Sequence, residues 1–182
     1  MLLAIVLGVA SCSTAPPGGS TFPSPASVPE SSASSAFGGT DLAWIEINIA
    51  MDEHLLPLLQ LVPTHSANPD VQALALQVKA FTEAELGILR QLHNEAGLPA
   101  VNPYEGTSMP GMVTAEQVTK AGEISGPVFD EIAVQQIRAH LEESQNLARS
   151  EDKSKMEQQT RGLALQILRT RHQTLLTLPK EG

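Results

Sequence analysis

The chain has 182 residues and a formal net charge of -9, and its aromatic residues are only one Trp, one Tyr and four Phe. A core built mainly from Leu, Ile, Val, Met and Ala favours helices. The acidic balance, without a dense run of Lys and Arg, excludes the basic surface that nucleic-acid binding requires.

Residues 1–11 predict an export signal. Residues 2–10 are almost all apolar, a stretch shorter than the roughly 20 residues of a membrane-spanning helix but typical of a signal peptide. The segment leads into VASC, which resembles the bacterial lipobox, although no Lys or Arg precedes it. We therefore expect Cys12 to become the lipidated N-terminus and to anchor the protein to the extracytoplasmic face of the cell membrane. An ordinary secreted protein is the alternative. Cys12 is the only cysteine, which excludes a disulfide within the chain.

Residues 12–40 are predicted to form a tether that begins at this cysteine. Ser, Pro, Gly, Ala and Thr dominate the segment, and so little apolar bulk cannot offset the entropy that is lost on folding. Such a tether would hold a soluble domain away from the membrane surface. The folded part is therefore predicted to span residues 41–180.

The folded part contains an internal repeat. When the sequence is shifted by 89 positions, ten residues fall on identical residues without a gap, and the apolar positions share the same register. The identical pairs include Asp41/Asp130, Ala50/Ala139, Glu53/Glu142, Leu74/Leu163, Ala75/Ala164 and Gln77/Gln166. The repeat divides the folded part into a first half at 41–97 and a second half at 126–180, joined by a crossover at 98–125.

Each half carries two helical patterns. In the first half, apolar residues recur every three or four positions from Leu42 to Leu59, and again from Val71 to Leu92 after the cap signal SANPD. The second half repeats both patterns. Two duplicated helical hairpins predict an all-α fold, an up-down four-helix bundle. Pro57 lies within the first pattern and is expected to bend or break that helix, because it removes a backbone hydrogen bond.

The crossover is longer than a bare connector between helices needs to be. It contains a short helical pattern that Thr114 could cap, with Glu116 or Gln117 in the first turn. It also contains the sequence MPGM at residues 109–112. Two methionines three residues apart can converge on a soft metal ion, or can simply pack over the bundle.

These features together resemble a bacterial family called domain of unknown function 305. The resemblance is carried by the lipobox, the tether, the two hairpins, the segment NPDVQALALQVKAFTEAELGILRQL and the MPGM motif, and it covers nearly all of the folded part. It implies a ferritin-like four-helix bundle that is exported or attached to the cell surface. In such proteins the first helix of each half carries Met-x-x-His-His and the second carries Gln, then Glu-Ile, then Met. The resemblance implies copper binding through these His and Met side chains.

Most of these positions differ in the present chain. In the first helix of each half, the position of the family's Met is occupied by Asn48 and Ile137, and the positions of the His-His pair by Met51-Asp52 and His140-Leu141. In the second helix of each half, the position of the Gln is occupied by Thr82 and Arg171, that of the Glu by Glu85 and Thr174, and that of the late Met by Leu89 and Leu178. Glu85, His140 and the intact MPGM sequence keep the pattern. The metal site that the resemblance implies is therefore degenerate.

Two interpretations of the bundle centre stay open. In the first, the centre and the crossover form a metal site with copper as its cofactor, although a mixture of oxygen, nitrogen and sulfur donors suits no single metal ion. The candidate metal ligands are Met51, Asp52, Glu85, His140, Met109 and Met112. In the second, which the shortage of ligands favours, the centre is a buried polar cluster in which Asp52 accepts a hydrogen bond from His140.

The sequence contains no recognisable catalytic motif. It has no nucleophile with a base partner, no phosphate-binding Gly-rich loop and no paired Glu-x-x-His motifs. We therefore expect a non-enzymatic lipoprotein that acts as a scaffold or interaction protein, with a protein partner in a membrane complex. The alternative is an envelope protein that binds or buffers copper or another transition metal.

Overall fold

The structure is a computed structural model that describes residues 37–152 and 157–179. The predicted signal segment, the lipidation site at Cys12 and most of the predicted tether lie outside these residues. The described part contains five helices and no strand, which confirms the all-α prediction. The helices are α1 (Gly39–His65), α2 (Pro69–Glu95), α3 (Ala115–Gly122), α4 (Pro127–Asp152) and α5 (Gln158–Leu176). The first helix thus begins two residues before the predicted boundary at residue 41.

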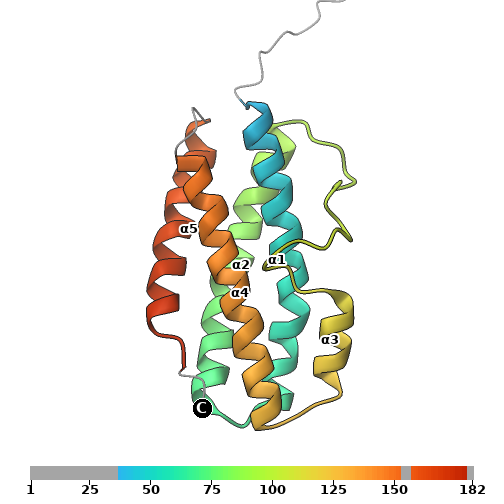
Figure 1. The fold of residues 1–182 in the computed structure, drawn as a ribbon. Helices are drawn as coiled ribbons and strands as arrows, with labels where there is room; N and C mark the ends of the chain where they lie inside the picture. The colour runs from blue at the N-terminus through green and yellow to red at the C-terminus, as the bar shows by residue number, and fades with distance from the viewer. Residues whose placement is uncertain (1–36, 153–156, 180–182) are drawn as a thin grey trace, which may run out of the picture. The chain divides into compact units, whose positions relative to one another are not determined.

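The four long helices form a bundle of two antiparallel hairpins, α1 with α2 and α4 with α5 (Figure 1). The backbone N–H of Gly126 donates to the carbonyl of His65 over 2.8 Å, so that α4 starts where α1 ends. The crossover carries the chain from one end of the bundle to the other, and α2 and α4 consequently run in the same direction (Figure 1). Within the described residues, no helix is both long and apolar enough to cross a membrane.

The helix boundaries follow the local signals in the sequence. Asn68 caps α2 through its Oδ1 atom, which accepts from the backbone N–H of Asp70 over 2.9 Å. Thr114 and Gln117 form a reciprocal capping box at the start of α3, as the sequence predicted. Pro57 does not break α1, which continues to His65. Its exposed position lets water satisfy the carbonyl group that the missing N–H leaves free.

An aspartate ties the start of α1 to the start of α5. Asp41 is buried, and its Oδ2 atom accepts from the backbone N–H of Gly38 over 2.6 Å. Its Oδ1 atom accepts from the backbone N–H of Glu157 over 3.1 Å. Glu157 in turn caps α5, because its carboxylate accepts from the backbone N–H groups of Gln159 and Thr160. The starts of α1 and α5, one helix from each hairpin, are thereby linked at one end of the bundle.

The bundle core consists of two apolar clusters with a polar layer between them. One cluster lies toward α3 and includes Leu58, Val78 and Phe129. The other lies toward the opposite end and includes Trp44 and Leu89. All four long helices contribute a polar side chain to the layer between the clusters, and these residues are Asp52, Glu85, His140, Ser144 and Arg171.

The MPGM sequence forms a tight turn that lies against α4. The backbone N–H of Met112 donates to the carbonyl of Met109 over 3.1 Å, and Gly111 has a φ of 71°, as a type II turn with Pro at its second position requires. A Cβ atom at Gly111 would lie 2.8 Å from the carbonyl oxygen of Ala139 and 2.5 Å from the Cβ of Glu143. The turn can approach α4 so closely only because residue 111 is glycine.

We predict that Gly111→Ala destabilises the bundle by at least about 2 kcal/mol, because strain at positive φ adds to a clash with the backbone of α4. Urea unfolding followed by circular dichroism measures this free energy. Gly106→Ala is the matched control, because Gly106 also has a positive φ, 74°, but open space around its Cβ position. Equal losses in the two variants would contradict a close approach of the turn to α4.

Candidate functional site

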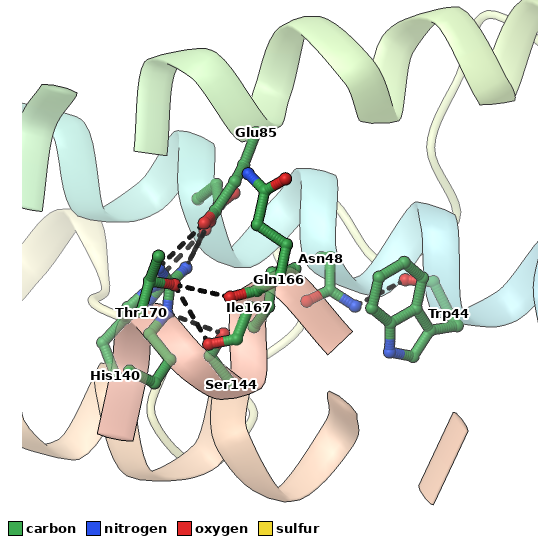
Figure 2. Close-up of polar contacts among 10 residues, drawn as sticks. Trp44, Asn48, Glu85, His140, Ser144, Gln166, Ile167 and Thr170 are labelled. Atoms are coloured by element: carbon green, nitrogen blue, oxygen red, sulfur yellow. Dashed lines mark hydrogen bonds and ion pairs between the residues drawn. The ribbon is translucent and has the colours of Figure 1, made fainter. Parts of the chain in front are cut away.

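The polar layer is built around the guanidinium group of Arg171, whose residue is fully buried on α5. Its Nη2 atom donates to Glu85 Oε2 over 2.6 Å, and its Nη1 atom donates to Glu85 Oε1 over 3.2 Å. Its Nε atom donates to Ser144 Oγ over 3.1 Å (Figure 2). The guanidinium carbon lies 4.4 Å from the ring centroid of Phe81, a cation–π distance. Side chains of α2, α4 and α5 therefore meet at one cation.

Asp52 and His140 extend this network to α1. Asp52 Oδ1 lies 3.8 Å from Arg171 Nη2 and 3.4 Å from His140 Nε2. These are ion-pair distances, and neither ring nitrogen of His140 has a well-formed hydrogen bond among the described residues. The predicted contact between Asp52 and His140 is thus present, but a cation shares the same carboxylate.

Burial dominates the protonation of the layer. It raises the pKa of Glu85 to about 7, against the attraction of Arg171, and the nearby charge of Asp52 raises it further. Burial lowers the pKa of His140, although Asp52 and the backbone of Gly111 oppose the change and Arg171 reinforces it. Near neutral pH the imidazole ring is therefore neutral, and Arg171 supplies the positive charge that balances the carboxylates.

The six predicted ligand residues divide into two groups. Asp52, Glu85 and His140 lie around Arg171. The sulfur-bearing residues form a separate cluster, in which Met51 and Met112 are buried and Met109 packs against them from the crossover. His140 lies between the two groups. It contacts Asp52 in the first group, and it interacts with the backbone of Gly111, which lies in the turn between Met109 and Met112. Within the described residues, no three His, Cys, Asp or Glu side chains converge closely enough to hold a metal ion.

Arg171 and Ser144 were missing from the predicted site. A signal for Arg171 exists in the sequence, because it stands on the core-facing row of α5 between Ile167 and Thr174, and the 89-residue shift pairs it with Thr82. A lone arginine on an apolar row must find a carboxylate partner in the core. No comparable signal exists for Ser144, since a buried serine is common in helices that pack closely.

The repeat register agrees with the structure. Both members of each repeat-related pair across the polar layer are buried, with at most 2% of the residue exposed. These pairs are Asn48/Ile137, Met51/His140, Asp52/Leu141, Thr82/Arg171 and Glu85/Thr174. The two halves therefore present equivalent positions to one shared centre, and the side chains at those positions have diverged.

Two repeated hairpins that enclose a shared polar layer define a duplicated four-helix bundle. The family model described as domain of unknown function (DUF305) matches residues 44–180, and the chain belongs to this family. None of the curated proteins matches the chain.

Two solved structures share the fold. One is a DUF305 protein from Streptomyces coelicolor, described as a candidate secreted protein, with 16% sequence identity and a TM-score of 0.68 over 76% of this chain and 89% of that one. The other is a DUF305 fragment from Deinococcus radiodurans, with 14% identity and a TM-score of 0.69 over 78% of this chain and 94% of that one. At these identities, the similarity establishes the fold alone.

We predict that Arg171→Met destabilises the bundle by about 3–5 kcal/mol, because it leaves Glu85 and Asp52 buried without a cation. The double variant Arg171→Met/Glu85→Met should recover the part of this loss that comes from Glu85, since an apolar pair fills the same space, whereas Asp52 keeps only His140 as a partner. Urea unfolding measures both effects. Arg169→Met, an exposed change on the same helix, should alter stability by less than about 0.5 kcal/mol. A loss at Arg171 no larger than that at Arg169 would contradict the network.

The raised pKa of Glu85 predicts a pH-dependent stability. Between its unfolded value of 4.5 and about 7, the folded chain holds a proton on Glu85 that the unfolded chain lacks, so this group makes stability fall as pH rises. His140 acts oppositely below pH 6.5, because the unfolded ring accepts a proton that the buried ring refuses. His140 is present in both wild type and Glu85→Gln, so its contribution cancels in the difference between their unfolding free energies.

We expect this difference, wild type minus Glu85→Gln, to fall by on the order of 3 kcal/mol between about pH 4.5 and pH 7.5. Urea unfolding at several pH values measures it. Glu83→Gln, the same substitution on the exposed face of α2, is the control. A pH-independent difference for Glu85 would mean that Arg171 keeps this carboxylate ionised throughout.

Proposed function

We propose that this protein is a non-enzymatic, exported lipoprotein whose bundle serves as a scaffold or interaction domain at the outer face of the membrane. The observation that carries the proposal is the position of Arg171. Its guanidinium group occupies the centre of the bundle and is bound to Glu85 and Ser144. A cation that belongs to the chain itself thus balances the carboxylates that would otherwise attract a metal ion.

Electrostatics support a centre that is closed to metal ions. An incoming cation would have to approach Asp52 and Glu85 beside a buried guanidinium, and charges repel strongly where the dielectric constant is low. The network is also shielded from solvent, since Arg171 and Glu85 are fully buried and Asp52 is 2% exposed. The same burial separates these polar groups from any dissolved substrate, which supports a role without catalysis.

A surface cavity lies away from the centre. It has a volume of about 290 Å³, between α1, α2 and the crossover, and it is lined in part by Glu53, Arg90, His93 and Asn102. Arg90 Nη2 donates to Glu53 Oε1 over 2.7 Å, so these two charges neutralise each other, and Glu105 is the further charged residue in the cavity wall. The cavity is open to solvent, and no serine, threonine or cysteine nucleophile is among the residues that line it, which supports a role without catalysis.

Export and anchoring follow from the N-terminal sequence. VASC provides the cysteine that lipid modification requires, and the Streptomyces relative is described as a candidate secreted protein. Cys12→Ala would test the anchor directly. The wild-type chain should sediment with membranes and carry a lipid on its N-terminal cysteine in mass spectrometry, whereas the variant should lack that lipid. Wild-type protein without lipid would refute the anchor.

Copper binding is a second candidate function, because Met51, Met109 and Met112 pack together and the backbone of Gly111, in the turn between Met109 and Met112, interacts with the His140 ring. Thioether and imidazole groups are the ligands that reduced copper prefers. This site would lie on the crossover side of the polar layer, where Arg171 does not occupy it. The two functions can be separated because they predict opposite results in a metal titration.

The decisive experiment titrates the full chain, with Cys12→Ser to remove the only thiol, with Cu(I) under anaerobic conditions and separately with Zn(II). A competing chelator sets the affinity scale. The closed-centre proposal predicts no stoichiometric binding of either ion. One equivalent of tightly bound Cu(I), lost in Met109→Leu/Met112→Leu and in His140→Ala, would establish the copper function instead. Ala139→Ser, an exposed change beside the turn, is the control variant.

A further inference from the structure

The outer face of α2 stands apart from the rest of this acidic protein. It carries no charged residue over five turns, and its two large apolar side chains are exposed, Leu76 at 71% and Ile88 at 38%. The remaining residues of the face are small or uncharged and are also exposed. The face consists of Ala73, Leu76, Gln77, Ala80, Ala84, Gly87, Ile88 and Gln91, which recur at spacings of three and four.

The residues of this face are arranged symmetrically about position 82. Leu76 and Ile88 lie six residues on either side of it, and Ala80 and Ala84 lie two residues on either side. Gln77 and Gly87, and likewise Ala73 and Gln91, are also equidistant from position 82. Two copies of α2 that cross antiparallel at this point would therefore place Leu76 at the same height as Ile88 of the other copy at both ends, and alanine at the same height as alanine in the middle.

The charges beside the face fit the same arrangement. Lys79 and Glu83 border one side of it, and Lys79 Nζ lies 2.6 Å from Glu83 Oε1 within the chain. A two-fold axis places this side of the face next to the same side of the second copy. Lys79 then lies opposite residue 85 of the second copy, which is only two residues, or about 3 Å along the helix axis, from Glu83 of that copy. Each Lys79 thus lies beside Glu83 of the second copy and offsets the approach of the two Glu83 side chains, which are also only two residues apart along the axis.

Small side chains allow the two helices to approach closely. Ala80, Ala84 and Gly87 stand between the two larger residues, and an added Cβ at Gly87 would meet no atom within 4 Å. Asp70 and Glu95 face each other only at the far ends, where solvent screens their repulsion. A self-complementary surface of this kind is the property of a two-fold symmetric interface.

We propose that the outer face of α2 is a docking surface for a second copy of this chain, which binds as an antiparallel two-fold dimer centred between Ala80 and Ala84. The face spans about 27 Å of helix, and a contact of one helix per subunit is smaller than a standard interface, so the dimer is of micromolar or weaker affinity. A shared membrane anchor would raise the effective concentration of the two copies. This inference is independent of whether the bundle centre binds copper.

Sedimentation equilibrium of the full chain with Cys12→Ser, from micromolar to near-millimolar concentration, tests the dimer. Ala80→Glu should weaken the dimer at least about tenfold, because the new carboxylate lies against Glu83 of the second copy. The change is on an exposed helical position and leaves folding intact, which circular dichroism verifies. Ala115→Glu, on the exposed surface of α3, adds the same charge and should have no effect.

Charge exchange tests the symmetry. Lys79→Glu should weaken the dimer, and Lys79→Glu/Glu83→Lys should restore it, because the exchange recreates the pairs both within the chain and between chains. A dimer that is not rescued by the exchange would overturn the proposed register. A chain that stays monomeric throughout the concentration range, or a dimer indifferent to Ala80→Glu, would overturn the surface itself.

Cysteine cross-linking tests the direction of the helices. In the Cys12→Ser chain, Ala73→Cys/Gln91→Cys should give a covalent dimer when oxidised glutathione converts each pair of thiols to a disulfide. Ala73→Cys alone should not, because the two copies of residue 73 lie about 27 Å apart in the antiparallel pair. The two cysteines of one chain are equally far apart, so no internal disulfide competes. Efficient cross-linking of the single variant would show a parallel pair and refute the proposal.

Discussion

The ion pair between Arg171 and Glu85 is the constraint on which the bundle centre depends. A guanidinium group cannot be deprotonated inside a protein, and it must therefore be given acceptors wherever it is buried. Glu85 and Ser144 accept its hydrogen bonds, and Asp52 balances charge from the facing hairpin. A single side chain on α5 thus contacts polar groups on the other three long helices at one height of the bundle.

This constraint gives the divergence of the two halves a physical meaning. Under the repeat, Arg171 corresponds to Thr82 and Glu85 corresponds to Thr174, so the charged residue and its partner come from opposite halves. The second half supplies Arg171 where the first half supplies the hydroxyl group of Thr82. The first half supplies Glu85 where the second half supplies the hydroxyl group of Thr174. A symmetric centre suits a shared ligand, whereas an asymmetric centre of this kind is satisfied by the protein alone. The two halves have become complementary instead of equivalent.

The sequence predicted the parts of the structure that depend on local interactions. The helices, the caps at Asn68 and Thr114 and the burial of Asp52, Glu85 and His140 follow from spacing and from residues within one turn. The partners of Arg171 could not be predicted. Glu85 and Ser144 lie 86 and 27 residues from it in the chain, and whether they reach it depends on how the helices are aligned along the bundle. The separation of the methionines from the carboxylates could not be predicted from the sequence either. It depends on the turn at Gly111, which determines the face of α4 that the crossover contacts.

The hydrogen bonds of Asp41 have a mechanical consequence. A chain that is held at its N-terminus and pulled elsewhere receives tension at the first residue of its folded part, here next to Gly38. Without Asp41 that tension would peel α1 away from its neighbours one turn at a time. The carboxylate instead joins Gly38 to Glu157 at the start of α5, so the load divides between two helices from different hairpins. The start of α1 therefore cannot separate from the bundle without also breaking the hydrogen bond to Glu157.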